Sequence, residues 1–344
     1  GWAGHMLAVD KHIREFSGFD PRALPDEVLQ SSEPAVLRGV AARWPMVQAG
    51  QQSAQAAVAY LRGFERKDAQ PVVAMVGPPD INGRFFYNAT LDEFNFRREN
   101  VPLGVALNTL LKYAKEPTPP AIYIGSTTID TWLPGFRNDN DFALGDREAL
   151  ASIWIGNRTR IAAHQDVPDN LACVVAGRRR VTLFPPQQLS NLYIGPLDFT
   201  PAGQAISLVD FDAPDYDRFP RFEEALRHAQ VAELGPGDAV FIPSMWWHHM
   251  EALETFNVLV NYWWRQTPAW MDTPMNALML ALMTVRDLPA EQRAVWEDVF
   301  RHYVFAPDEA TADHIPADAL RALGPIDEAR ARAMRARLLQ RLNH

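Results

Sequence analysis

The chain has 344 residues, of which 47% are hydrophobic and 22% charged, and it carries a formal net charge of −9 at pH 7. This length allows a sizeable core in one large domain or two small ones, and the composition is ordinary for a globular protein. The acidic balance argues against non-specific binding to nucleic acid or to an anionic membrane, since both favour a basic surface. No apolar run reaches 18 residues, so we expect no transmembrane helix.

The start of the chain and its cysteine content allow two further expectations. Residues 1–6, GWAGHM, are typical of a tag remnant that ends at an initiator methionine, so we expect no signal peptide. Cys173 is the single cysteine, which leaves it without a partner for an intrachain disulfide. That content fits a reducing compartment, and we expect a cytoplasmic protein.

Residues 7–118 mix helical and strand patterns, which predicts an N-terminal α/β region. A helix start is indicated at Pro25, because proline and the acidic residues after it favour a first helical turn. Apolar spacing and short apolar runs predict strands at 34–40, 72–77 and 84–88 and helices at 51–64 and 101–114.

The pattern changes over residues 119–267. Short β-rich runs recur between proline, glycine, asparagine and aspartate: AIYIG, SIWIG, LACVVAG, RRVTLFP, AVFIP and FNVLVNYWW. Short β-rich runs separated regularly by such turn-forming residues are typical of a β-sandwich or β-barrel. A proline- and aspartate-rich connection at 195–222 interrupts the runs, and connections of that length are usually functional or packed over a site.

Residues 268–344 return to helical patterns. The first of these helices carries a broad apolar stripe, made of Met275, Leu278, Met279, Leu282 and Met283. A continuous apolar face outside the core needs burial somewhere. We therefore expect a homodimer through these C-terminal helices, with packing against the chain's own β domain as the alternative.

The run HQDVPDN places His164 two residues before Asp166. In a strand, residues two apart point to the same face, so the imidazole and the carboxylate would lie side by side. Of the nine histidines, His248 and His249 remain as a third donor, because the others lie near the ends, in the helical tail or among charged neighbours. Two histidines and one carboxylate form the facial triad of non-haem Fe(II) oxygenases. The alternative is a buried histidine–aspartate pair held by a hydrogen bond.

Several motifs occur in one order: HQDVPDNLACVVAGRRRVTLFPP, VDFDAPDYDRFPRF, GPGDAVFIPSMWWHHMEAL and NVLVNYWW. Together they resemble the JmjC or cupin-like Fe(II)/2-oxoglutarate oxygenases, most of all the asparaginyl hydroxylases among them, and also the tRNA wybutosine hydroxylases. The resemblance covers roughly residues 120–265, and several ordered motifs are more specific than one. It implies a mainly β fold with α elaborations: a double-stranded β-helix, or jelly roll of the cupin/JmjC type, between the N-terminal α/β region and the C-terminal helices.

The resemblance also implies the residues of a site. The iron ligands would be His164, Asp166 and His248, and His249 would face the opposite way along the strand as a packed residue. The expected contacts to 2-oxoglutarate are Tyr123 and Arg179 at its far carboxylate, Asn170 and Asn261 near its other carboxylate, and Trp263 as an aromatic near the iron. Each of these five side chains also has an ordinary structural role, as a core aromatic, an exposed strand arginine or a turn asparagine.

Three positions depart from the family pattern or lie near its substrate contacts. Arg179 stands where the similar hydroxylases have lysine, and its planar fork can bind a carboxylate bidentately. Ile161 stands where the asparaginyl hydroxylases have threonine, and Thr159 is the alternative source of that hydroxyl. Gly125 lies near the position at which the related hydroxylases carry a substrate-contacting side chain.

The implied reaction oxidises a substrate C–H bond with Fe(II), 2-oxoglutarate and dioxygen, and it releases succinate and carbon dioxide. We expect a hydroxylase acting on a protein side chain or a small molecule, although demethylation of an N-methyl group would use the same chemistry. The alternatives are a non-catalytic metal-binding cupin-like module and a tRNA-modifying hydroxylase. The last requires a basic face, and the acidic balance does not favour a nucleic-acid partner.

Overall fold

The structure is a computed structural model that describes residues 7–343. The expected tag remnant at residues 1–6 lies outside the described residues. The chain divides into two compact units, one that ends at Arg265 and one that begins at Gln266.

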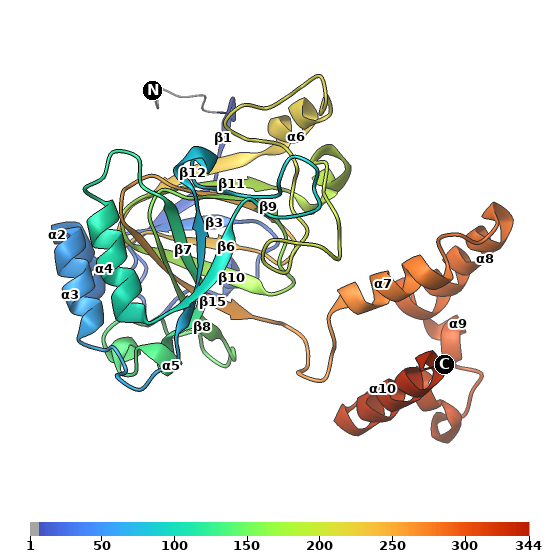
Figure 1. The fold of residues 1–344 in the computed structure, drawn as a ribbon. Coiled ribbons are helices and arrows are strands. Elements are labelled where there is room, and N and C mark those ends of the chain that lie inside the picture. Colours follow the sequence, from blue (N-terminus) through green and yellow to red (C-terminus); the bar gives the residue numbers. More distant parts are fainter. Residues whose placement is uncertain (1–6, 344) are drawn as a thin grey trace. The chain divides into compact units, whose positions relative to one another are not determined.

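Two mixed β-sheets form the first unit (Figure 1). The smaller sheet has the spatial order β1 (Lys11–His12), β12 (Gln230–Leu234), β11 (Arg179–Phe184), β14 (Trp247–Ala252), β9 (Arg160–His164) and β5 (Arg84–Phe85). The larger has the order β2 (Glu15–Ser17), β3 (Ala35–Arg38), β13 (Ala239–Ile242), β10 (Asp169–Ala176), β15 (Asn257–Trp264), β8 (Leu150–Gly156), β7 (Ala121–Thr128), β4 (Val72–Gly77) and β6 (Arg97–Val101). Strands β8 to β11 and again β12 to β15 alternate between the two sheets. The predicted jelly roll is confirmed.

The N-terminal region contributes strands to this jelly roll. β3 pairs antiparallel with β13 and β4 pairs antiparallel with β7, so residues 7–118 extend the larger sheet at both of its ends. The strand predicted at 84–88 is only the two-residue β5. Directly after β5, the backbone N–H of Phe86 donates to the side-chain Oδ1 of Asn95 and not to a neighbouring strand, so the β-ladder does not continue.

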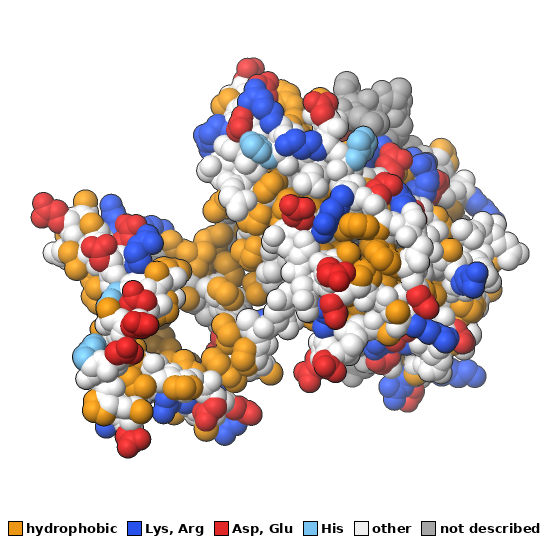
Figure 2. All heavy atoms as spheres, turned by 180° about the vertical axis from the view of Figure 1, so that it is seen from behind, with side chains coloured by type: hydrophobic (Ala, Val, Ile, Leu, Met, Phe, Trp, Pro, Cys, Tyr) orange, Lys and Arg blue, Asp and Glu red, His pale blue; other side chains and the backbone are white. Residues whose placement is uncertain are grey.

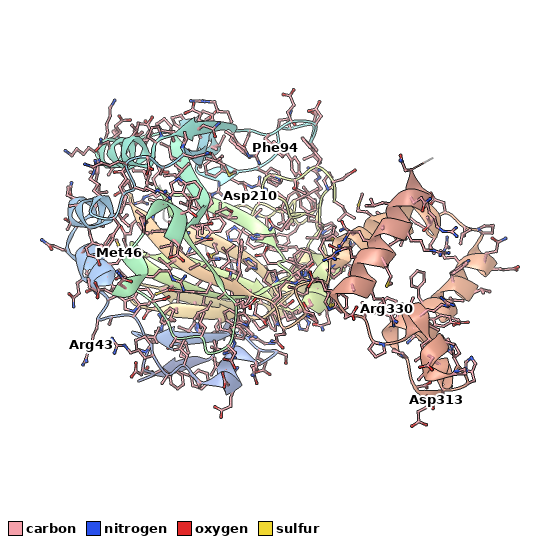
Figure 3. The ribbon with its side chains drawn as sticks, turned by 90° about the horizontal axis from the view of Figure 1, so that it is seen from below. Arg43, Met46, Phe94, Asp210, Asp313 and Arg330 are labelled. Carbon is pink, nitrogen blue, oxygen red and sulfur yellow. The ribbon has the colours of Figure 1, made fainter. Side chains whose placement is uncertain are left out.

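Helices cover the outer face of the larger sheet. Figure 1 shows α2 (Pro45–Gln52), α3 (Ala54–Arg62) and α4 (Leu103–Tyr113) side by side, and α2 also contacts β10. Met46, labelled in Figure 3, is fully buried on α2. The sequence predicted α3 and α4 but not α2, which begins at a proline and is short. The remaining α-helices of this unit are α1 (Asp26–Leu29), α5 (Ile129–Trp132) and α6 (Phe222–His228).

Alternation along the strands separates two apolar layers. On β10, Cys173 belongs to the cluster beneath the helices, whereas Ala172 and Val174 belong to the cluster between the sheets. On β11, Val181 and Leu183 also belong to the cluster between the sheets. Residues on the same faces of β10 and β11 as the cluster between the sheets therefore point into the interior of the jelly roll, where the candidate site lies.

The second unit is helical and has little core of its own. It contains α7 (Pro274–Thr284), α8 (Ala290–Phe300), a π-helical turn (Arg301–Phe305), α9 (Glu309–Ala312) and α10 (Glu328–Leu342). Thr311 is the one buried residue of 266–343. Hydrophobic side chains are displayed on the surface of these helices in Figure 2. Within the described part of the chain, every helix is too short or too polar to cross a bilayer.

Candidate active site

His164 and His248 stand opposite each other on neighbouring strands. β9 and β14 pair antiparallel with these two residues in register, and their ring centroids are 4.2 Å apart. Asp166 brings its Oδ2 to 3.1 Å from His248 Nε2 and 3.7 Å from His164 Nε2. The ligand atoms of the three side chains lie within 4.8 Å of one another, which is a spacing that suits a shared metal ion. The structure thus brings together the three residues that the sequence selected.

Asp166 reaches this cluster by a different route from the one expected. The premise that His164 and Asp166 share a strand face was wrong, because β9 ends at His164 and Asp166 lies in the turn before β10. That turn is tied to the one before β14: the Asp166 carbonyl accepts the Met245 backbone N–H at 3.0 Å, and the Gln165 amide donates to the Met245 carbonyl at 2.9 Å. The paired turns, and not strand alternation, direct the carboxylate inward.

Hydrogen bonds fix which nitrogen of each histidine is available. His164 Nδ1 lies 2.9 Å from the Ala162 carbonyl and His248 Nδ1 lies 3.1 Å from the Trp246 carbonyl. A carbonyl only accepts, so each Nδ1 carries the proton and each Nε2 presents a lone pair. These lone pairs face the carboxylate of Asp166, an arrangement that is repulsive unless a cation lies among them. The donor set therefore fits a bound divalent metal.

Protonation at neutral pH agrees with metal binding. Burial, followed by the nearby His248, lowers the pKa of His164 to about 4. Burial alone would raise the pKa of Asp166, but in acid a hydrogen bond from the protonated His248 and the charges of both protonated histidines outweigh it and lower this pKa to about 2. A neutral imidazole and an ionised carboxylate are the forms that bind metal.

His249 lies on the other side of β14, as predicted. It is buried and stacks on Phe211 with ring centroids 4.3 Å apart and planes 18° apart. Burial lowers its pKa to about 3. It is a packed residue outside the metal cluster.

A cavity of about 120 Å³ lies against the metal cluster. Its lining includes the three cluster residues and four of the five expected cosubstrate contacts, Tyr123, Asn170, Asn261 and Trp263. The rest of the lining is mainly apolar or aromatic: Met75, Phe85, Ser126, Trp154, Ile161, Ala162, Pro201, Ala202, Gln204, Ile206, Met250 and Leu259. Among the described residues, Asp166 is the one carboxylate that lines the cavity, and no lysine or arginine does so.

Arg179 lies just beyond the lining, behind Tyr123. It shares the inner face of β11 with Val181 and is only 1% exposed, whereas its neighbour Arg180 pairs outward with Glu233 and Glu251. Burial lowers the pKa of Arg179, while the hydroxyl of Tyr123 beside it raises that pKa. Its Nε and Nη2 have no hydrogen-bond partner in the structure. A buried guanidinium with unpaired donors fits a site for a carboxylate that a ligand would bring.

Ile161, at which the sequence predicted a departure from the family pattern, lies at the cavity. Its side chain lines the cavity, whereas Thr159 is buried and does not belong to the lining. Thr159 therefore does not replace the missing hydroxyl. Trp263 lines the cavity with an indole Nε1 that has no hydrogen-bond partner, and this donor is a further polar group at the site.

The sequence did not single out Gln204, which belongs to the 195–222 connection. Its Nε2 donates to Asp166 Oδ1 at 2.8 Å, so the connection holds the oxygen that does not face the histidines. Aromatic packing anchors the same segment: Phe199 stacks on Phe94, labelled in Figure 3, at 4.6 Å, and the Tyr87 hydroxyl donates to the Phe199 carbonyl. The expectation that this connection shapes the site is confirmed. No sequence signal marked the glutamine itself.

Replacement of Gln204 by leucine is expected to weaken divalent-metal binding by about tenfold, because partners that orient a metal ligand typically contribute 10–100-fold. Titration of the metal-free protein with Mn(II), followed by electron paramagnetic resonance, measures this. Gln187→Leu is the matched control, since Gln187 is an exposed glutamine outside the cavity lining. Equal metal affinities in the two variants would show that Gln204 does not orient Asp166.

Comparison with known protein families agrees with the fold. Residues 21–269 match the family model described as a cupin-like domain. This match spans more than half of the chain, so the protein belongs to the cupin-like family.

Three curated relatives are similar over shorter regions. The chain is 37% identical over 123 residues to the lysine-specific demethylase JMJ31 of Arabidopsis thaliana. The aligned region is 35% of this chain and 22% of that protein. It is 39% identical over 106 residues to the tRNA wybutosine-synthesizing protein 5 of Danio rerio, 31% of this chain and 29% of that protein. It is 35% identical over 127 residues to the human HSPB1-associated protein 1, 36% of this chain and 25% of that protein. In each case the chain matches less than a third of the relative's length.

Proposed function

We propose that this protein is an Fe(II)- and 2-oxoglutarate-dependent oxygenase that hydroxylates a protein side chain or a small molecule. The observation that carries the proposal is Arg179, a fully buried guanidinium with two unpaired nitrogens in the same interior as the His164–Asp166–His248 cluster. 2-Oxoglutarate matches both features. One of its carboxylates would pair with the guanidinium, and its other carboxylate and keto oxygen suit a metal with open positions.

In this proposal each residue of the site has a separate role. His164, Asp166 and His248 would hold the iron, which when bound with 2-oxoglutarate supplies the activation of dioxygen. Overall, 2-oxoglutarate, dioxygen and a substrate C–H bond give succinate, carbon dioxide and a hydroxylated product. Arg179 and Tyr123 would bind the far carboxylate. The apolar lining would exclude water from the reacting atoms.

The lining of the cavity favours an uncharged substrate group. Its one carboxylate belongs to the metal cluster, and the rest of the described lining is apolar, aromatic or neutral polar. A cationic methyl-lysine would lose its hydration there without a counter-ion, which is costly. Hydroxylation of a neutral side chain or small molecule is therefore favoured over demethylation. On the face in Figure 2, acidic and basic side chains are interspersed, and no broad basic expanse suited to tRNA is seen on that face.

Succinate formation tests the proposal. The protein is incubated with Fe(II), ascorbate, dioxygen and 2-oxoglutarate, and succinate is measured by mass spectrometry with and without a pool of candidate peptides and metabolites. We expect slow succinate release alone and faster release with a substrate whose mass rises by one oxygen atom. Absence of both turnover and 2-oxoglutarate binding would leave a non-catalytic metal-binding module as the function.

We further propose that a second copy of this chain covers the C-terminal helices. The stripe side chains on α7 are well exposed, with Met275 at 38%, Leu278 at 43% and Met283 at 70%. A unit of helices with Thr311 as its one buried residue cannot account for its stability by its own core. Paired stripes of a symmetric dimer would supply the missing apolar contact.

The double variant Leu278→Glu with Leu282→Glu is expected to convert a dimer to a monomer, because it buries charge at the paired stripe. Light scattering after size exclusion measures the mass. Gln292→Glu with Gln340→Glu adds the same charge at exposed polar positions of α8 and α10 and is expected to leave the dimer intact. A monomeric parent protein, or a dimer that survives the leucine variant, would rule out this interface.

A further inference from the structure

Trp154 lines the cavity, although the sequence did not assign it a role in the expected site. It lies on β8, it is half-buried, and its indole Nε1 donates a hydrogen bond of 2.7 Å to Asn261 Oδ1. An indole N–H can only donate. This contact therefore fixes the orientation of the Asn261 amide, with its oxygen toward Trp154.

The orientation of Asn261 determines that of Asn170. Asn261 Nδ2 donates to Asn170 Oδ1 at 3.3 Å across the neighbouring strands β15 and β10. The oxygen of Asn170 is thus engaged. Its NH₂ group is what remains for the cavity that the side chain lines.

Two further contacts hold the Trp154 ring in place. It stacks on Tyr123 with centroids 5.9 Å apart and meets Trp263 edge-on at 5.8 Å. It also lies against Gly125, where an added Cβ would come within 2.8 Å of the indole Cζ3. The absence of a side chain at Gly125 therefore leaves the space that this indole occupies.

We propose that Trp154 is a positioning residue for cosubstrate binding. Its N–H sets the polarity of the Asn261–Asn170 amide pair, so that Asn170 presents donors and not an oxygen to the metal-proximal carboxylate of 2-oxoglutarate. This inference rests on the proposed function. Without the indole donor, either amide can turn over, and an amide oxygen that faces a carboxylate is repulsive.

The test removes the donor and keeps an aromatic ring. Trp154→Phe is compared with the parent protein by calorimetric titration of 2-oxoglutarate into Mn(II)-loaded protein without dioxygen. We expect on the order of tenfold weaker binding, because a hydrogen bond to a charged group is lost, and unchanged Mn(II) affinity. Trp264→Phe is the matched control: Trp264 Nε1 is buried but makes no hydrogen bond, and that indole is not part of the cavity lining.

A double-mutant cycle separates amide positioning from packing. If Trp154 acts through Asn170, Trp154→Phe weakens binding in the parent protein but adds nothing in an Asn170→Ala background. Equal losses in both backgrounds would overturn the inference, since the indole would then act through its packing on Tyr123 and Trp263. Unchanged binding in Trp154→Phe would overturn it as well. If the parent protein does not bind 2-oxoglutarate, the proposed function itself is contradicted. The titration of the parent protein shows this before any variant is made.

Discussion

His248→Ala is expected to abolish 2-oxoglutarate turnover and to prevent tight Fe(II) binding. The variant removes a neutral Nε2 that faces Asp166 Oδ2 at 3.1 Å, which leaves a carboxylate and one imidazole to hold the metal. Loss of a residue that merely orients a ligand costs roughly 10–100-fold, so loss of the ligand itself is expected to exceed that range. Succinate formation and Mn(II) titration measure the two effects independently.

The adjacent residue provides the control. His249→Phe changes the other face of the same strand, where the ring stacks on Phe211. A phenyl ring preserves that stacking and leaves the metal cluster intact, so metal affinity and turnover are expected to remain close to those of the parent protein. The choice of His248 over His249 would be contradicted if the His249 variant lost metal and the His248 variant kept it.

Arg179→Met is expected to weaken 2-oxoglutarate binding by roughly a hundredfold and yet to leave the ligand-free protein at least as stable as before. The guanidinium is buried, and two of its nitrogens have no partner. Removal of an uncompensated buried charge is commonly stabilising, whereas loss of a bidentate pair with a carboxylate removes about 3 kcal/mol of binding free energy. Calorimetry gives the affinity, and thermal unfolding without ligand gives the stability.

Arg180→Met should behave in the opposite way. Arg180 pairs with Glu251 at 3.0 Å and with Glu233 at 2.9 Å on the outer face of the same strand. Its loss leaves Glu251, whose pKa burial already raises, without its ion-pair partner, so the unfolding temperature should fall while 2-oxoglutarate binding stays the same. If both variants lost stability and neither lost affinity, Arg179 would be a structural residue and the carboxylate site would lie elsewhere.

The arginine at this position and the isoleucine nearby are consistent with each other. Ile161 offers no hydroxyl to a carboxylate, and Thr159 is outside the cavity. A guanidinium provides two parallel donors in a plane where an ammonium provides a point charge. In the proposed site, the second donor of Arg179 compensates for the hydroxyl that Ile161 lacks.

The sequence by itself determined the components of the site and the class of fold. His164, Asp166 and His248 are sparse polar residues in apolar runs, and the spacing of the β-rich runs predicted a sandwich or barrel. The resemblance carried by the ordered motifs implied the jelly roll and the set of three metal ligands. Alternation allowed only one of His248 and His249 to face the site, and the family resemblance selected His248 and, among the three arginines, Arg179. These conclusions depend on local periodicity, chemical type and the order of motifs, which a sequence contains.

Only the tertiary structure decided how distant segments complete the site. Asp166 is directed inward by the pairing of two turns almost 80 residues apart in the chain, Gln204 reaches its carboxylate from a long connection, and Trp154 orients Asn261 and through it Asn170. Glutamine and tryptophan carry no periodic signal for such roles, because a single hydrogen bond between remote side chains depends on the packing of both segments. For the same reason the sequence did not reveal that residues 7–118 extend the larger sheet. Pairing partners are set by the assembled sheet and not by the strand alone.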